Sequence, residues 1–124
     1  IKYHEWLSAA TGLSFTYDDL MKAGQRIVNL ERALNVRFGV RREHDTLPKR
    51  FLTQPVPTGP FKGAVFSKEK LDEMLDEYYE LRGWERETGL PYRETLIELG
   101  LSDVAEDLEQ RGLVATRIKE PSGQ

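Results

Sequence analysis

Cysteine is absent from this sequence of 124 residues, and long apolar runs are absent as well. Without cysteine the chain forms no disulfide, no thiolate metal site, no iron–sulfur ligation and no cysteine nucleophile of its own. No apolar run approaches the ~18 residues of a membrane span, and no signal-peptide core opens the sequence. We therefore expect no membrane partner and a cytoplasmic location.

The residues that are present predict one folded domain. Aromatic residues make up 10% of the chain and the net charge is only −3, so a core can form and disorder is excluded. A chain of this length has room for a single core of ordinary size. The sequence begins with Ile1 rather than Met, and we expect it to be a piece of a longer protein.

Apolar residues recur at three- and four-residue spacing, which predicts helices punctuated by glycine. The fold class is therefore all-α, a multi-helix orthogonal bundle. The expected N-caps are Thr16, Ser67 and Ser102. The expected helices cover residues 2–11, 17–36, a short segment around 50–52, 68–82, a segment ending at Gly100, and 102–112.

Two helices have apolar stripes that we expect to be buried. In the helix over residues 17–36 the stripe comprises Leu20, Ala23, Ile27, Leu30 and Leu34. In the helix over residues 68–82 it comprises Leu71, Met74, Leu75, Tyr78 and Leu81. Gly24 lies inside the first of these helices. It either permits a close packing contact or is a residue of low helix propensity with no packing role.

Proline and glycine interrupt the helical pattern over residues 53–66. Three prolines there remove backbone donors, so this segment is expected to be an extended strap on the surface, with a domain linker as the alternative. Its expected anchors against the helices are Phe51, Phe61, Val65 and Phe66. Residues 113–124 are expected to fray, and only residues 63–66 and 113–118 are compatible with strands.

No group of side chains meets the spacing of a self-contained active site. His44 lies between Glu43 and Asp45, but neighbours on an extended chain point to opposite sides and do not close on one metal. Asp18 and Asp19 lack the glycine turn and closing Glu of a calcium loop and are better explained by helix-start electrostatics.

Other candidate chemistries are equally incomplete. Lys62 lies between Gly59 and Gly63 but lacks the Gly-Lys-Ser or Gly-Lys-Thr step of a phosphate loop. Asp72 and Asp76 share a helix face, although an acidic surface does not raise a carboxyl pKa for acid–base catalysis. The residues alone therefore predict a helical domain without catalytic, cofactor-binding or metal-ligating side chains.

Charge is distributed unevenly along the chain. Residues 37–50 hold five bases and two acids, whereas residues 94–110 hold six acids and no base. The basic stretch has no aromatic residues arranged for stacking, so it is a weak nucleic-acid signal, and a solvated or internally paired face is the preferred interpretation. We expect no nucleic-acid partner.

Several linked motifs resemble one enzyme family. They are LMKAGQRIVNLER at residues 20–32, NVRFG at 35–39, DTLPKRF at 45–51, PTGP with KG at 57–63, MLDEYYELRGW at 74–84, GLP at 89–91 and LGL at 99–101. In this order and close to this spacing they are similar to the carboxyl end of the tungsten-containing aldehyde ferredoxin oxidoreductases. The resemblance covers nearly the whole chain.

The resemblance implies a much larger oxidoreductase. Members of the family hold tungsten, or sometimes molybdenum, on two pterins beside a four-iron four-sulfur cluster, oxidise aldehydes to carboxylates and pass electrons to ferredoxin. The cluster cysteines and catalytic residues of the family lie upstream of the position that Ile1 matches. This chain is then expected to be a carboxyl-terminal helical domain that covers the cofactor and the substrate passage, partners the remaining domains and is inactive alone.

The resemblance also implies a structural motif, whose members are Gly24, Arg26, Asn29, Arg32, Asn35, Arg37 and Gly39. These residues are expected to hold the long helix and the following turn against the cofactor-bearing domains, with buried Arg and Asn satisfied by hydrogen bonds. Phe38 stands where the family usually has Glu, and Tyr92 stands where a Thr cap is common.

A free-standing helical adaptor is the alternative, and it predicts no large apolar patch on the surface. A domain cut from a larger body instead exposes an apolar patch beyond the about 300 to 600 Å² usual for a monomer. Such a fragment can pair with itself to cover that patch.

Overall fold

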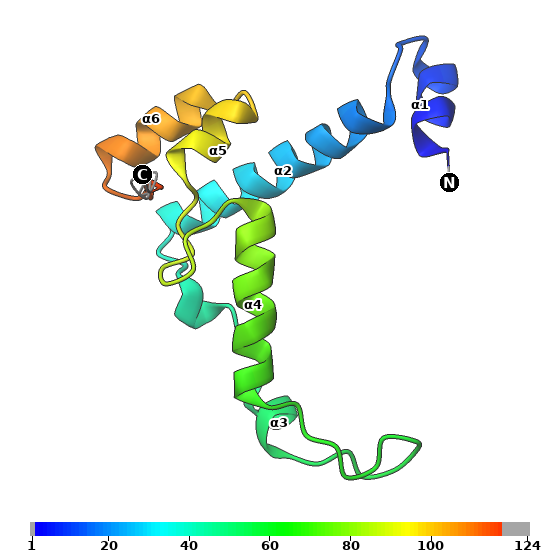
Figure 1. Cartoon of the computed structure of the whole chain (residues 1–124), viewed down its shortest axis with the longest axis vertical. Coiled ribbons are helices and arrows are strands. Elements are labelled where there is room, and N and C mark those ends of the chain that lie inside the picture. The colour runs from blue at the N-terminus through cyan, green and yellow to red at the C-terminus, as the bar shows by residue number, and fades with distance from the viewer. Residues whose placement is uncertain (1, 118–124) are drawn as a thin grey trace, which may run out of the picture.

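The structure, a computed structural model, describes residues 2–117 and contains no β-strand within that range. Its helices are α1 (Tyr3–Thr11), α2 (Tyr17–Arg37), the 3₁₀ turn η1 (Arg42–His44), α3 (Lys49–Thr53), α4 (Lys68–Arg82), α5 (Arg93–Glu98) and α6 (Ser102–Gln110). The predicted all-α class is confirmed, and α4 extends away from the long helix α2, with its carboxyl end nearest α2 (Figure 1).

Helix starts follow local side-chain chemistry. The Thr16 hydroxyl accepts from the Asp19 amide at 3.1 Å, and the Asp19 carboxylate accepts from the Thr16 amide at 2.9 Å, which completes a capping box at the start of α2. Ser67 caps α4 by accepting from the Lys70 amide. The prediction for Ser102 is wrong: Leu101 is the N-cap of α6, and no side chain makes the capping bond.

One hydrophobic core joins the carboxyl-terminal half of α2 to α5 and α6 (Figure 1). Its buried members are Ala33, Val36, Leu96, Leu101, Ala105 and Leu108. Partly buried apolar residues from the neighbouring turns, among them Leu90 and Leu113, pack against it. The α2 residues in this core lie outside the stripe that the sequence favoured.

The predicted buried stripe of α2 is wrong for three of its five members. Ile27 is 59% exposed, and Leu30 and Leu34 are also exposed, whereas Leu20 and Ala23 are half-buried. The buried residues of α2 are Asn29, Arg32, Ala33 and Val36. The physical reason is that the chain packs only one face of α2, and no other helix within residues 2–117 covers the more apolar face.

The predicted buried face of α4 is also wrong for three of its five members, whereas Leu71 and Leu75 are half-buried. Met74, Tyr78 and Leu81 are exposed, and Tyr79 is the buried residue of the helix. Gly24 of α2 also faces open space within the described residues, since a Cβ built there meets no atom within 4 Å.

The strap over residues 53–66 is turn-rich and exposed along its length, and it lies beyond the far end of α4 (Figure 1). Its expected anchors are exposed too, with Phe61 at 74%, so the prediction that they pack on the helices is wrong within this chain. The loop is instead closed by its own backbone, because the Val56 amide donates to the Ala64 carbonyl and the Gly63 amide donates to the Val56 carbonyl.

The segment after α6 begins as ordered structure rather than as a frayed tail. Ala115 is buried and forms a parallel bridge with Tyr92. The Ala115 carbonyl also accepts from the Arg93 amide at 2.9 Å. Fraying is therefore wrong at this position, and the rest of the predicted tail, residues 118–124, lies outside the described residues.

Candidate functional site

The interior of the molecule contains a buried arginine. Arg32 of α2 is 4% exposed, and its Nε donates to the Gly89 carbonyl at 2.8 Å. Its Nη1 donates to the Asp45 carboxylate at 2.7 Å, and Nη2 donates to the Tyr79 hydroxyl at 3.3 Å. The guanidinium carbon lies 4.6 Å from the Trp84 ring centroid. The charge is thus compensated by one carboxylate, two neutral acceptors and an aromatic face.

Tyr79 of α4 completes this network. Its side chain is fully buried, and its hydroxyl donates a short hydrogen bond to the Asp45 carboxylate. Burial raises the pKa of Tyr79 to about 12, with the bond to Asp45 acting in the same direction and the neighbouring Arg32 charge opposing both. Tyr79 therefore stays protonated near neutral pH and acts as a fixed hydrogen-bond donor.

Asn29 joins α2 to the end of α4. Its Oδ1 accepts from the Trp84 indole at 2.9 Å, and its Nδ2 donates to the carbonyls of Gln25 and Arg82 at 3.1 and 3.4 Å. The side chain is completely buried, and both of its polar atoms have partners. The prediction that Asn and Arg of the motif are buried and hydrogen-bonded holds for Asn29 and Arg32, whose partners lie within this chain.

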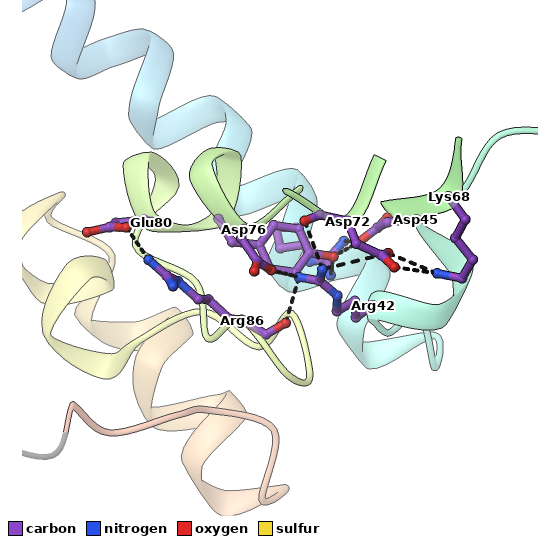
Figure 2. A network of polar contacts seen from close by, with 9 residues as sticks. Arg42, Asp45, Lys68, Asp72, Asp76, Glu80 and Arg86 are labelled. Carbon is purple, nitrogen blue, oxygen red and sulfur yellow. Dashed lines mark hydrogen bonds and ion pairs between the residues drawn. The ribbon is translucent and has the colours of Figure 1, made fainter. Parts of the chain in front are cut away.

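Arg42 of η1 forms the outer part of the network, and Figure 2 shows how it lies against α4. Its Nη1 is 2.7 Å from Asp76 and donates to the Arg86 carbonyl at 2.8 Å, while Nη2 donates to the Asp72 carbonyl at 3.2 Å. Asp72 also pairs with Lys68 at 2.8 Å. These contacts fix η1 and the turn at Arg86 to α4.

The turn after α4 leaves no space beside Arg32. Gly89 has a φ of +73°, and a Cβ built there would lie 2.0 Å from Arg32 Nη2. Only glycine combines this backbone conformation with so close an approach. The carbonyl of the same residue is the acceptor of Arg32 Nε, so this position shapes the network directly.

The remaining motif residues are spread over the surface rather than gathered at one site. Arg26 Nε donates to the Leu99 carbonyl at 2.8 Å, and Arg37 lies 3.6 Å from Asp107. Asn35 is exposed, and Gly39 follows α2 with a φ of +90°. Like Gly24, Gly39 has open space beside its Cα, since a Cβ built there would have no atom of the described residues within 4 Å.

The other candidate residues from the sequence make hydrogen bonds or ion pairs with neighbours in the described part of the chain. The Asp19 carboxylate belongs to the capping box, and that hydrogen bonding to Thr16 lowers its pKa. His44 is exposed, and its Nδ1 accepts from the Arg41 amide. Asp72 and Asp76 both pair with Arg42. These partners satisfy the side chains without forming a reaction centre.

Sequence reasoning missed the partners of Arg32, namely Asp45, Tyr79, Trp84 and Gly89. The available signal was the pair Asn29 and Arg32, which share the spacing of Ala33 and Val36 on one helix face. Polar residues at core spacing indicate a buried hydrogen-bond network, although they do not name its other members.

Within residues 2–117 the donor set does not fit an iron–sulfur cluster or another metal centre ligated by protein side chains. The chain has no cysteine, and within residues 2–117 no three His, Asp or Glu side chains come together as a metal site would require. None of the helices in that range is long and apolar enough to cross a membrane.

A shallow apolar groove lies between α2 and α6. Its volume is about 550 Å³, and its floor is formed by Leu30, Ala33, Leu34 and Val104. Its charged lining residues are Glu31, Arg37, Asp103 and Asp107. The groove continues the exposed stripe of α2, and Phe38, four residues after Leu34 and 83% exposed, extends that stripe.

The fold and these surfaces define a class: a helical module whose polar interior is structural and whose apolar face is left uncovered. Residues 1–101 match the model of the family described as aldehyde ferredoxin oxidoreductase, domains 2 and 3. The chain therefore belongs to the aldehyde ferredoxin oxidoreductase family, as the motifs indicated.

Named relatives agree with this assignment. The chain is 48% identical over 102 residues to a tungsten-containing aldehyde ferredoxin oxidoreductase of Pyrococcus horikoshii, a match that covers 82% of this chain and 16% of the relative. It is 46% identical over 102 residues to the Pyrococcus furiosus protein of the same name, with the same coverage. It is 30% identical over 116 residues to an aliphatic sulfonate oxidoreductase, WOR-like subunit, of Pyrococcus furiosus, covering 88% of this chain and 18% of that subunit.

A solved structure shares the fold. A chain of the active site complex BamBC of benzoyl coenzyme A reductase, in complex with 1,5-dienoyl-CoA, superposes with a TM-score of 0.73 at 31% identity. The similarity covers 93% of this chain and 16% of that chain. This chain thus spans about a sixth of the length of the proteins it resembles.

Proposed function

We propose that this chain is the carboxyl-terminal helical part of a cytoplasmic oxidoreductase that oxidises aldehydes to carboxylates at a tungstopterin or molybdopterin centre. In this proposal the electrons leave through a four-iron four-sulfur cluster to ferredoxin. The chain supplies no reacting group; it covers the cofactor-bearing domains and the substrate passage. Membership of the family and the names of the relatives support the reaction class.

The observation that carries the covering role is the uncovered face of α2. Ile27, Leu30 and Leu34 are exposed at helical spacing, and the groove beside α6 continues this apolar surface. Exposed apolar side chains gathered on one helix face favour a protein contact. They also disfavour a free-standing adaptor, which should bury such residues by itself.

The buried network gives this surface a fixed shape. Arg32 and Asn29 lie on the opposite side of α2 from Ile27 and Leu34, and they tie the helix to α4 and to the turn at Gly89. The uncovered stripe is thereby presented on a rigid helix, which lowers the entropy lost when a neighbouring domain packs on it.

The other motif residues have a distinct role in this proposal. Gly24, Asn35 and Gly39 are exposed on or just after α2, with open space around both glycines. We assign them, together with Arg26 and Arg37, to contacts with the neighbouring domains, since the small or polar side chains permit close approach and hydrogen bonding.

Complementation in two pieces tests the proposal. The 124-residue chain is co-expressed with the Pyrococcus furiosus aldehyde ferredoxin oxidoreductase shortened by the part that this chain matches. The expected result is a stable complex that oxidises aldehydes, whereas the chain alone is inactive.

Substitution of the stripe supplies the control. Burying one leucine contributes about 1.5 to 3 kcal/mol, so the double variant Leu30→Ser, Leu34→Ser should bind the shortened enzyme at least about a hundredfold more weakly. Thermal unfolding of the isolated variant should stay close to wild type because both leucines are exposed. Equal binding by wild type and double variant contradicts the covering role.

A further inference from the structure

One end of the molecule combines positive charge with exposed apolar side chains. We define the strap end as residues 46–68, which include α3 and the strap. It holds Lys49, Arg50, Lys62 and Lys68 and contains no Asp or Glu, although the whole chain has a net charge of −3. Among the described residues, no ion pair involves Lys49, Arg50 or Lys62.

Most large apolar residues of the strap end are exposed within the described part of the chain, whereas Leu47 and Leu52 are half-buried. Its exposed large apolar residues are Phe51, Val56, Phe61, Val65 and Phe66. Figure 1 places this end beyond α4, on the side away from the core formed by α2, α5 and α6. Neither the core nor the α2 groove therefore provides a contact surface for it.

The loop that carries Phe61 is bridged by backbone hydrogen bonds and restricted by prolines. The Val56 amide donates to the Ala64 carbonyl, and nearer the base of the loop the Phe66 amide donates to the Phe51 carbonyl. Gly59 and Gly63 both have a φ of +86°, yet neither has an atom within 4 Å of its Cβ position. Three prolines fix further backbone angles. A loop restricted in this way loses less conformational entropy when it binds.

We propose that the strap end is a docking arm that inserts Phe61 into an apolar pocket with carboxylates at its rim, located on the part of the oxidoreductase polypeptide outside this chain. Lys62 pairs with a rim carboxylate, and Lys49 and Arg50 add longer-range attraction. This inference rests on the proposed function, because it assumes that the chain packs against the remainder of such an enzyme.

Three observations favour this occupant. Aromatic side chains, phenylalanine among them, are enriched at protein interfaces relative to the rest of the surface. Bases without neighbouring acids favour an acidic counterpart, because complementary charges steer association and select partners. The strap lies inside residues 1–101, which match the family model, and about five sixths of the length of the relatives has no counterpart in this chain.

Binding measurements on the complementing pair test the arm. Wild type, Phe61→Ser and Lys62→Glu are titrated against the shortened Pyrococcus furiosus polypeptide at low and at moderate salt. Phe61→Ser should raise the Kd at least tenfold at either salt concentration. Lys62→Glu should raise the Kd at low salt and flatten the salt dependence.

Lys22→Glu is the matched control, since it makes the same charge reversal at an exposed position of α2. It should leave the Kd within about twofold of wild type. All variants should unfold at the wild-type temperature in isolation, because the substituted residues are exposed.

Trypsin supplies a second measurement that needs no complementing pair. A chimera is made in which this chain replaces the matching part of the Pyrococcus furiosus enzyme. Cleavage after Lys62 should be at least tenfold slower in the chimera than in the isolated chain. Equal cleavage rates in the two proteins would overturn the proposal that the strap end is a docking arm.

The two proposals fail in different ways. If wild type binds while Phe61→Ser and Lys62→Glu bind equally well, the arm is overturned and the covering role stands. If wild type does not bind, the covering role fails and the arm fails with it. If Lys62→Glu abolishes self-association of the isolated chain but leaves the complex unchanged, the occupant is a second copy and the arm as proposed is overturned.

Discussion

The packed half of the molecule and its two extremities are built from similar residues and reach different outcomes. In the packed half, α5 and α6 bury Leu96 and Leu108 completely against α2. In the extremities, α1 has no buried residue, and the strap end exposes Phe51 and Phe61. The difference is the availability of a second surface within the chain rather than apolarity.

Helix α2 belongs to both regions at once. Ala33 and Val36 face the core, whereas Ile27 and Leu34 face solvent on the same helix. The chain therefore buries one face of α2 and leaves the other exposed within the described residues. Substitutions on the two faces should separate stability from association.

The largest effect is expected at the centre of the packed half. Arg32→Ala removes the buried partner of an ion pair, leaves the Gly89 carbonyl without its donor and leaves Asp45 with the Tyr79 hydroxyl but no counter-charge from Arg32. The free energy of unfolding should fall by about 3 to 5 kcal/mol in urea titrations of the isolated chain.

Arg37→Ala is the control for that prediction. Its pair with Asp107 is half exposed at 3.6 Å, so the loss should be about 0.5 kcal/mol or less. A similar loss for both arginines would show that the buried network does not distinguish the packed half from the surface.

The next largest effect compares two leucines. Leu96→Ala opens a cavity in the core and should lower the free energy of unfolding by about 2 to 5 kcal/mol. Leu34→Ala, on the uncovered stripe, should change it by no more than about 0.5 kcal/mol. Calorimetry of both variants measures the contrast, and equal losses would place Leu34 in the core after all.

The smallest effect is expected from alkaline titration. The folded-state pKa of Tyr79, about 12, lies above the ordinary phenol value of 10.0, so folding favours the protonated phenol. Its contribution is complete below pH 10 and is lost as pH rises toward 12. A tenfold change in proton affinity corresponds to about 1.4 kcal/mol, which limits the loss to at most about 2 to 3 kcal/mol.

Tyr79→Phe separates this titration from that of the lysines. The difference in unfolding free energy between wild type and Tyr79→Phe should shrink between pH 10 and 12, as followed by circular dichroism in guanidinium chloride. A difference that stays constant over this range means that the phenol does not titrate with folding.

Local signals predicted most of the helices because capping and closing residues act within a few positions. Thr16 bonds to Asp19, and Gly83 closes α4 with a φ of +72°, so both boundaries are written into neighbouring residues. Ser102 misled because a hydroxyl near a helix start does not guarantee the capping geometry, which Leu101 occupies instead.

Local capping and closing residues could not predict which face of α2 is buried or which residues hydrogen-bond to it. Apolar spacing identifies a face that favours burial, but it does not say whether the covering surface belongs to the same chain. Arg32 finds its acceptors 13, 47 and 57 residues away in sequence, at Asp45, Tyr79 and Gly89. Contacts of that range depend on the tertiary fold, so only the polar spacing of Asn29 and Arg32 was visible beforehand.

The distance in sequence between Arg32 and Gly89 determines when their hydrogen bond can form during translation. A ribosome translates Arg32 long before Gly89, so the guanidinium lacks its carbonyl acceptor until 57 further residues have been added. Throughout that interval the nascent α2 is not yet tied to the turn after α4. A nascent chain halted before residue 89 therefore lacks the hydrogen bond that ties α2 to this turn.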